Sequence, residues 1–124
     1  MNPYHIDVQV KTQFVPEQSQ PEQHQYFFAY TITIKNDGKV AAQLLTRKWL
    51  ITDANGKVQE VHGKGVVGEQ PYLKLGEQFR YTSAVMLETP VGSMQGSYQM
   101  KAEDNTLFDA PIPVFRLAWQ AVLH

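Results

Sequence analysis

Apolar and polar residues alternate along most of the chain, and helical spacing is nearly absent. A period of two is typical of β-strands that have one face in a core and the other in water. The first predicted strand lies near residues 4–11, and its inner face carries Tyr4, Ile6, Val8 and Val10. A second strand is predicted from Tyr26 to Lys35. Both of its faces carry apolar side chains, which indicates a central position in a sheet.

The same alternation predicts five further strands. They lie near residues 43–53, 57–61, 77–87, 94–102 and 108–114. Asn55-Gly56 predicts a hairpin turn, because glycine readily adopts the positive φ that such turns require. The third strand is expected to carry these side chains on one face: Leu45, Arg47, Trp49 and Ile51.

The segments between and after these strands lack the alternation. Residues 16–25 are rich in Gln, Glu and Pro, so this segment is predicted to be a solvated loop. The tail from Leu117 to His124 is expected to add a short helical turn.

Seven short strands separated by turn signals predict an all-β fold, an antiparallel β-sandwich that forms one domain over residues 1–124. Trp49 is expected to anchor its core. Pro111 and Pro113 lie on the outward side of the last strand, whose inner side carries Ile112 and Val114. Proline cannot donate a hydrogen bond to a neighbouring strand, so the last strand is predicted to lie at a sheet edge.

Composition and charge exclude several classes of protein. Eleven Lys+Arg and twelve Asp+Glu give a net charge of −1 without a basic cluster, so no nucleic-acid partner is expected. The absence of cysteine excludes disulfides and thiolate metal sites. The sequence shows neither a signal-peptide pattern nor an apolar run that could cross a membrane. We therefore predict a cytoplasmic protein with no membrane partner and no cofactor.

Three glycines, Gly63, Gly65 and Gly68, have the spacing G-x-G-x-x-G of a dinucleotide-binding loop. Such a loop needs a following helix, whose N-terminus binds the phosphates. Here Glu69-Gln70-Pro71 follows, and no helix is predicted. Two interpretations remain. The loop could bind a phosphate-containing small molecule through its N–H groups, with Lys64 as the counter-charge. The alternative, which we favour, is that the glycines serve only backbone geometry.

Arg47 is the second candidate binding residue. The alternation places it beside Trp49 on an apolar face, where an unpaired charge would be costly. A structural arginine would pack its stem on Trp49 and donate to loop carbonyls or a carboxylate. A functional arginine would clamp an anion beside the glycine loop. The structural role is favoured, because buried charges are usually paired.

Metal binding and catalysis have little support in the sequence. The four histidines are scattered and lack ligand spacing: His5, His24, His62 and His124. Glu60 and His62 would share a strand face but would need further ligands. None of the candidate hydroxyls lies in a nucleophile-elbow sequence: Ser83, Ser93 and Ser97. No metal site and no catalytic residue are therefore predicted.

Motifs along nearly the whole chain resemble the ApaG family. They are Phe28 to Ile34, Gln43-Leu44-Leu45 with Arg47 and Trp49, the glycine segment through Pro71, Tyr81-Thr82-Ser83, Pro90 to Tyr98, and Ile112-Pro113 with Phe115 and Leu117. The resemblance implies an immunoglobulin- or fibronectin type III-like sandwich. It also implies an association with cobalt/magnesium homeostasis, because bacterial members are commonly labelled as efflux proteins. A chain without a membrane segment is not itself a transporter.

The resemblance also implies a role in protein binding, the role associated with related domains in larger eukaryotic proteins, including F-box proteins and a polymerase-delta-interacting protein. The leading hypothesis from the sequence is therefore a non-enzymatic module that binds a protein partner through a loop end, a sheet face or a sheet edge. The competing hypothesis is a Mg²⁺-linked sensor of a nucleotide or pyrophosphate at Gly63–Gly68, assisted by Arg47. Self-association into a homo-oligomer is compatible with the exposed edges of a sandwich.

Overall fold

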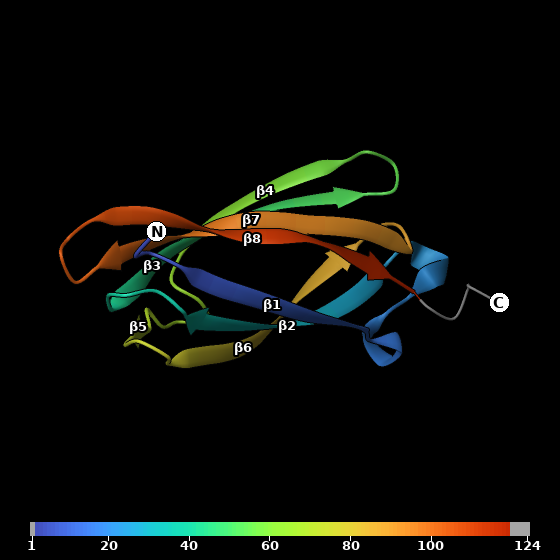
Figure 1. Cartoon of the computed structure of the whole chain (residues 1–124). Helices are drawn as coiled ribbons and strands as arrows, with labels where there is room; N and C mark the ends of the chain where they lie inside the picture. Colours follow the sequence, from blue (N-terminus) through green and yellow to red (C-terminus); the bar gives the residue numbers. More distant parts are fainter. Residues whose placement is uncertain (1, 120–124) are drawn as a thin grey trace.

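Figure 1 shows the protein as a computed structural model that describes residues 2–119. The strands are β1 (Ile6–Phe14), β2 (Tyr26–Asn36), β3 (Ala42–Asp53), β4 (Val58–Lys64), β5 (Tyr72–Leu73), β6 (Gln78–Leu87), β7 (Val91–Ala102) and β8 (Leu107–Ala118). The predicted loop over residues 16–25 contains two short 3-10 turns, Pro16–Gln18 and Pro21–Gln23. No helix in the described part of the chain is long and apolar enough to cross a lipid bilayer.

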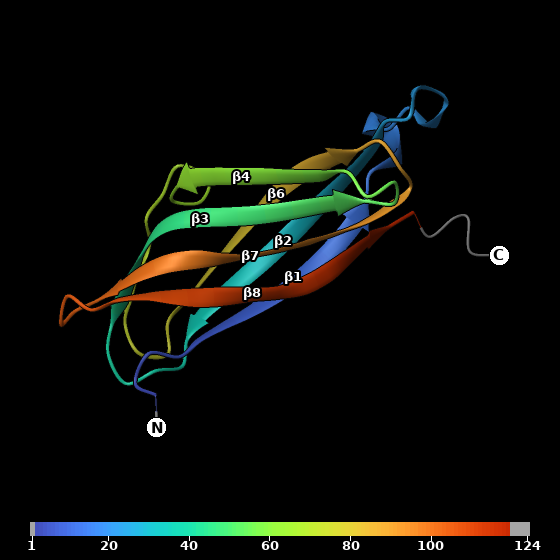
Figure 2. The same cartoon turned by 90° about the horizontal axis from the view of Figure 1, so that it is seen from above.

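The strands form two stacked antiparallel sheets (Figures 1 and 2). The smaller sheet has the order β1-β2-β6, and the larger has the order β4-β3-β7-β8, with β5 added beside β3. Every strand pair is antiparallel. This arrangement confirms the predicted β-sandwich. The alternation of the sequence missed only β5, because a strand of two residues is too short to show a period.

The burial of β2 follows its sequence pattern. Its inner side chains are all buried, and its outer side chains are partly covered except for the exposed Lys35. β2 pairs with β1 on one side and with β6 on the other, which confirms its predicted central position. The inner residues are Tyr26, Phe28, Tyr30, Ile32 and Ile34.

The predicted face of the third strand is wrong at one residue. The register of β3 against β7 shifts between Leu44 and Thr46, which marks a β-bulge at Leu45. A bulge inserts one extra residue and reverses the side-chain alternation beyond it. Leu44 is therefore completely buried in place of Leu45, while Trp49 and Ile51 keep the inner positions that the sequence predicts.

A second bulge changes the end of β8. The register against β7 shifts between Met94 and Gly96, so Leu117 is buried while Val114 is 63% exposed. Val114 was expected inside, and that prediction is wrong. The order of the sheet does place β8 at an edge, which confirms the prediction made from the prolines. Strand β8 extends through Leu117, where a helical turn was expected, and residues 120–124 of the tail lie outside the described residues.

The aromatic core joins the two sheets. Trp49 on β3 is 2% exposed and makes edge-to-face contacts with three rings, at centroid distances of 5.5 Å for Tyr30, 6.5 Å for Tyr98 and 5.8 Å for Phe115. Tyr30 belongs to the smaller sheet, whereas Tyr98 and Phe115 belong to the larger one. This ring cluster therefore contributes to the contact between the layers.

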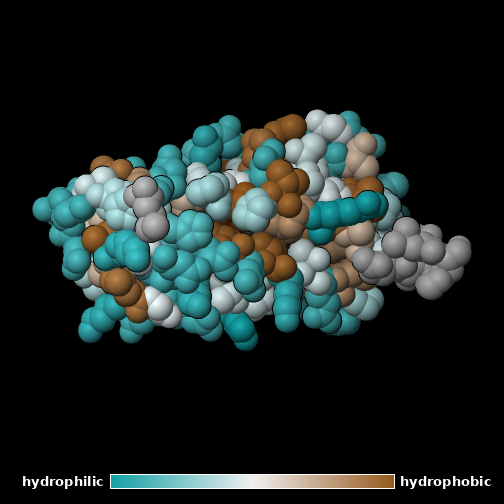
Figure 3. Space-filling view, viewed as in Figure 1, coloured by the Kyte–Doolittle hydropathy of each residue, from teal (hydrophilic) through white to brown (hydrophobic). Residues whose placement is uncertain are grey.

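The two long sides of the sandwich differ. β1 and β8 lie close together, whereas the edge strands β4 and β6 lie apart. Figure 3 shows hydrophobic surface gathered near the middle of the face on which β1 and β8 lie. In Figure 2 the opposite side is bordered by β4, with β6 passing beneath it. We call this β4–β6 side the open side.

Truncation of Trp49 tests the role of the ring cluster. Trp49→Ala should lower the free energy of unfolding by about 3–5 kcal/mol, because it removes a buried aromatic side chain and leaves a cavity. Chemical denaturation followed by circular dichroism measures this change. Val114→Ala is the control, since its exposed side chain should have little effect on stability. A Trp49→Ala protein as stable as the control would contradict the assignment of Trp49 as the core anchor.

Candidate functional site

The first two glycines of the G-x-G-x-x-G segment are bound into the larger sheet. Strand β4 extends through Lys64, beyond the predicted end at Val61, so Gly63 pairs with Arg47 of β3. The Gly65 N–H donates to the Leu45 carbonyl at 2.8 Å. This donor of the predicted anion loop is therefore used in backbone pairing.

The third glycine lies in a tight hairpin turn. Val66 and Glu69 exchange two backbone hydrogen bonds, of 2.8 and 2.9 Å. The residues between them, Val67 and Gly68, have φ values of 43° and 82°. Two successive residues with positive φ are typical of a type I′ turn. Gly65 also has a positive φ, of 66°, and a Cβ there would collide with the Glu69 carbonyl oxygen.

Arg47 holds this hairpin from its inner side. Its Nη1 donates to the carbonyls of Lys64 at 3.1 Å and Gly65 at 2.8 Å. The guanidinium lies directly over Gly63, where a Cβ would stand 2.5 Å from the Arg47 Cζ. Gly63 therefore makes room for the guanidinium, and the guanidinium satisfies two loop carbonyls. This is the geometry of a structural arginine.

The structure brings all five predicted binding residues to one hairpin, where Arg47 contacts Gly63, Lys64 and Gly65, and Gly68 lies at the turn. A hollow of about 290 Å³ beside the hairpin is lined by Lys64, Gly65, Gly68, Glu69 and Gln70, without Arg47. Arg47 faces carbonyl oxygens, and Glu69 brings a carboxylate to the hollow. These contacts explain why glycines are needed for the backbone of this hairpin. Anion binding at the loop stays a prediction.

Glu60 and His62 do share a strand face, as predicted. His62 Nε2 and Glu60 Oε1 are 2.9 Å apart, and Lys48 Nζ lies 4.0 Å from the same oxygen. The hydrogen bond with His62 and the charge of Lys48 lower the pKa of the exposed Glu60. Among residues 2–119 no group of three His, Cys, Asp or Glu side chains could hold a metal ion.

The candidate hydroxyls have no catalytic partner. Within the described part of the chain, none of the side chains of Ser83, Ser93 and Ser97 hydrogen-bonds to a histidine or a carboxylate. A serine nucleophile needs an adjacent base within hydrogen-bond reach. The described residues therefore offer no activated nucleophile of this kind.

The open side contains a cleft between two strand edges. It lies between β4 and β6, measures about 490 Å³, and we call it the β4–β6 cleft. Val61 and Val85 line its two walls, and Tyr30, Trp49, Ile51 and Met94 contribute from the core. Arg47, Gln59 and Ser83 add polar groups to the lining. The sequence predicts Trp49 as a core residue but not this cleft, because the cleft depends on which strands become edges.

Trp49 adds an unsatisfied donor to this region. Its Nε1 is buried and has no acceptor among the described residues. Buried Trp N–H groups usually find a hydrogen-bond partner, and leaving one unpaired is unfavourable. The cleft thus combines apolar and polar side chains with a tryptophan whose buried donor has no acceptor among the described residues.

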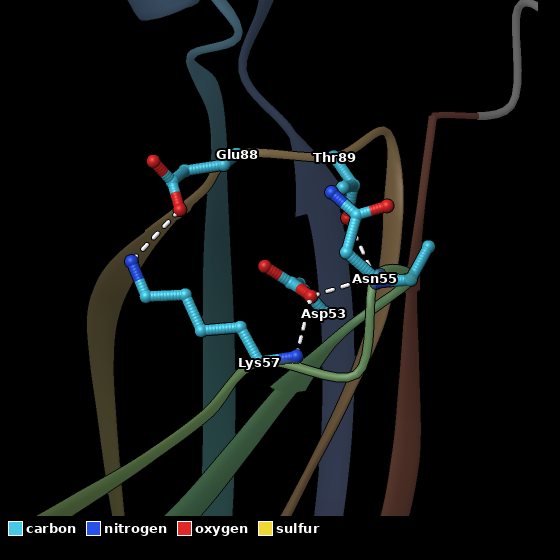
Figure 4. A network of polar contacts seen from close by, with 6 residues as sticks. Asp53, Asn55, Lys57, Glu88 and Thr89 are labelled. Atoms are coloured by element: carbon cyan, nitrogen blue, oxygen red, sulfur yellow. Dashed lines mark hydrogen bonds and ion pairs between the residues drawn. The ribbon is translucent and has the colours of Figure 1, made fainter.

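A polar network ties the two sheets together at one end of the open side (Figure 4). Lys57 Nζ lies 2.8 Å from Glu88 Oε1, which joins the β3–β4 turn to the segment that follows β6. The Thr89 hydroxyl accepts from the Ala54 N–H at 3.0 Å, and the Asp53 carboxylate accepts from the Lys57 N–H at 3.0 Å. The hydrogen bond to Glu88 raises the pKa of Lys57. This end of the cleft is therefore bridged.

Comparisons with known proteins define the class to which this sandwich belongs. A family model described as the ApaG domain matches residues 16–102. A crystal structure of an ApaA protein from Bordetella pertussis superposes with a TM-score of 0.92 at 50% identity, covering 94% of this chain and 95% of that chain. The protein is thus a β-sandwich of the ApaG-domain type.

Proteins with similar sequences support the same assignment. Protein ApaG of Azoarcus sp. (strain BH72) is 60% identical over 98% of this chain and 95% of its own length. Protein ApaG of Azotobacter vinelandii is also 60% identical, over 98% of this chain and 96% of its own length. The chain belongs to the ApaG family.

Substitutions at the glycines test their structural role. Gly63→Ala should displace the Arg47 guanidinium and lower stability by about 1.5–3 kcal/mol, the usual range for hydrogen bonds from a charged group. Gly68→Ala should cost about 1–2 kcal/mol through its positive φ alone, because no atom lies near its Cβ position. Thermal unfolding of Gly63→Ala, alone and combined with Arg47→Met, measures the energetic coupling between these two residues. If Gly63→Ala is equally destabilising in the Arg47→Met background, the proposed contact is wrong.

Proposed function

We propose that this chain is a non-enzymatic protein-binding module that engages its partner at the open side of the sandwich. The observation that carries the proposal is the β4–β6 cleft, which lies between two strand edges and has Val61 and Val85 on its walls. Hydrophobic surface in a concave site, flanked by unpaired edges, is the surface that a protein partner can cover. The resemblance to the ApaG family, from which a protein-binding module is expected, agrees with this role.

An exposed apolar side chain at the cleft supports the proposal. Met86 on β6 is 52% exposed and lines the cleft. It lies on an edge strand of the open side. A partner that covers Met86 would remove apolar surface from water, which is the main favourable term in most protein associations.

In this proposal, the association with cobalt/magnesium homeostasis operates through the protein partner. The described residues offer no convergent metal ligands of their own. A cytoplasmic location is part of the same proposal, and it determines which extract should contain the partner.

Affinity capture from a cytoplasmic extract tests the proposal. The immobilised chain should retain a protein that Met86→Glu fails to retain, because the new carboxylate would be desolvated at the interface. Val114→Glu is the matched control, since Val114 is similarly exposed but lies on β8. The captured protein is then purified, and calorimetry should show at least about a tenfold weaker Kd for Met86→Glu, the loss of one modest hot spot. Equal binding by both variants would contradict the proposal.

The alternative function is a small-anion sensor at Gly63–Gly68. One observation favours it: the N–H groups of Val67 and Gly68 have no acceptor among the described residues, and Lys64 lies nearby. Successive free N–H groups can form an anion-binding concavity.

An amide NMR titration with pyrophosphate and ATP, with and without Mg²⁺, tests this alternative. Saturable shifts confined to residues 63–68 would establish an anion site. We expect unchanged amide shifts at millimolar ligand, because Arg47 is already bound to carbonyls and Glu69 opposes a second anion.

A further inference from the structure

Among the described residues, no strand pairs with the outer edge of β6, which ends the smaller sheet. In an antiparallel pair, alternate residues direct both backbone groups to the neighbouring strand. The Asn36 N–H donates to the Glu77 carbonyl at 3.0 Å. This pair lies next to the first pair of an unbroken register between β2 and β6, Lys35 with Gln78. The odd-numbered residues of β6 therefore bond to β2. The N–H and C=O groups that face away from β2 belong to Gln78, Arg80, Thr82, Ala84 and Met86.

The other edges of the sandwich are protected against strand pairing, whereas β6 is not. β8 carries Pro111 and Pro113, and β1 lies beside β8. The outward positions of β4 include Glu60, His62 and Lys64. Prolines, charges and covering segments are the usual protections of an edge. The β6 edge has no proline and no bulge, and Arg80 is the only charged side chain among its outward residues.

The charges along this edge are complementary under two-fold symmetry. Arg80 lies four residues before Ala84, and Glu88 lies four residues after it. In an antiparallel pair of two β6 strands centred on Ala84, Arg80 of each copy therefore faces Glu88 of the other. The same register places Thr82 opposite the exposed Met86.

Both charged groups are available for this contact. Arg80 is exposed, its Nε donates to Thr33 at 3.2 Å, and no described carboxylate lies within ion-pair distance of it. Glu88 binds Lys57 through Oε1, and its side chain remains 63% exposed. A second cation can therefore approach the Glu88 carboxylate.

We infer that the partner at the β6 edge is a second copy of this chain, which pairs antiparallel about Ala84 and joins the two smaller sheets into one continuous sheet. This inference rests on the proposed function, because it names the occupant of the open side. The contact is isologous, so the same patch of each copy meets itself and the assembly closes as a dimer.

Sedimentation velocity over a range of protein concentrations tests the inference. The unaltered chain should form a dimer, and Ala84→Pro should be monomeric, because proline removes an outward N–H that the fold itself does not use. Glu60→Pro is the matched control. It removes an outward N–H from the β4 edge and should remain dimeric.

Charge reversal tests the register. Arg80→Glu and Glu88→Arg should each weaken the dimer, and the double variant should restore it, because the two pairs are reformed with opposite sign. Lys57→Met removes the same intramolecular ion pair as Glu88→Arg but should remain dimeric. Amide hydrogen exchange gives an independent readout. Protection of Thr82, Ala84 and Met86 should rise with protein concentration, while Tyr81, Ser83 and Val85 should be protected throughout.

The outcomes separate this inference from the proposed function. A chain that stays monomeric at millimolar concentration overturns the second-copy inference, whereas loss of a captured protein in Met86→Glu would still support the module. A dimer that Glu60→Pro disrupts, or that Ala84→Pro leaves intact, overturns pairing through β6. Failure of the double charge variant to restore the dimer overturns the register about Ala84.

Discussion

The contact between the two sheets depends on Trp49, which lies on β3 and meets rings from both layers. Tyr30 approaches from the smaller sheet, and Tyr98 and Phe115 approach from the larger one. Edge-to-face ring contacts are directional, so they restrict how the sheets sit on each other as well as contributing buried area. Trp49 also lines the β4–β6 cleft. The residue that holds the core is thus part of the surface that we propose for binding.

The two long sides of the sandwich are used differently because their edge strands differ. On one side β1 and β8 come together, and prolines on β8 remove donors that another strand would need. On the other side β4 and β6 lie apart, and the network around Lys57 and Glu88 bridges one end. Exposed sheet edges promote unwanted strand pairing, and proteins usually protect them. An edge without proline, bulge or dense charge is therefore a candidate interaction surface.

The glycine segment shows how spacing alone can mislead. G-x-G-x-x-G describes a phosphate loop only when a helix follows, and here the last glycine lies inside a type I′ turn that leads to β5. Gly63 accommodates a guanidinium, Gly65 accommodates a carbonyl, and Gly68 supplies positive φ. Arg47, for which the sequence favoured a structural role over an anion clamp, donates to two carbonyls of this hairpin. The same residues therefore form one unit, and the contacts they make are with each other.

The sequence by itself determined the fold class, the central position of β2 and the edge position of β8, because period-two alternation and proline are local signals. It could not locate the bulges at Leu45 and before Phe115, because a bulge depends on the register with a neighbouring strand, and so it misplaced Leu45 and Val114. Only the tertiary structure decided which strands became the open edges, and hence where the cleft lies. Edges and clefts arise from the packing of strands far apart in sequence, which no local pattern encodes.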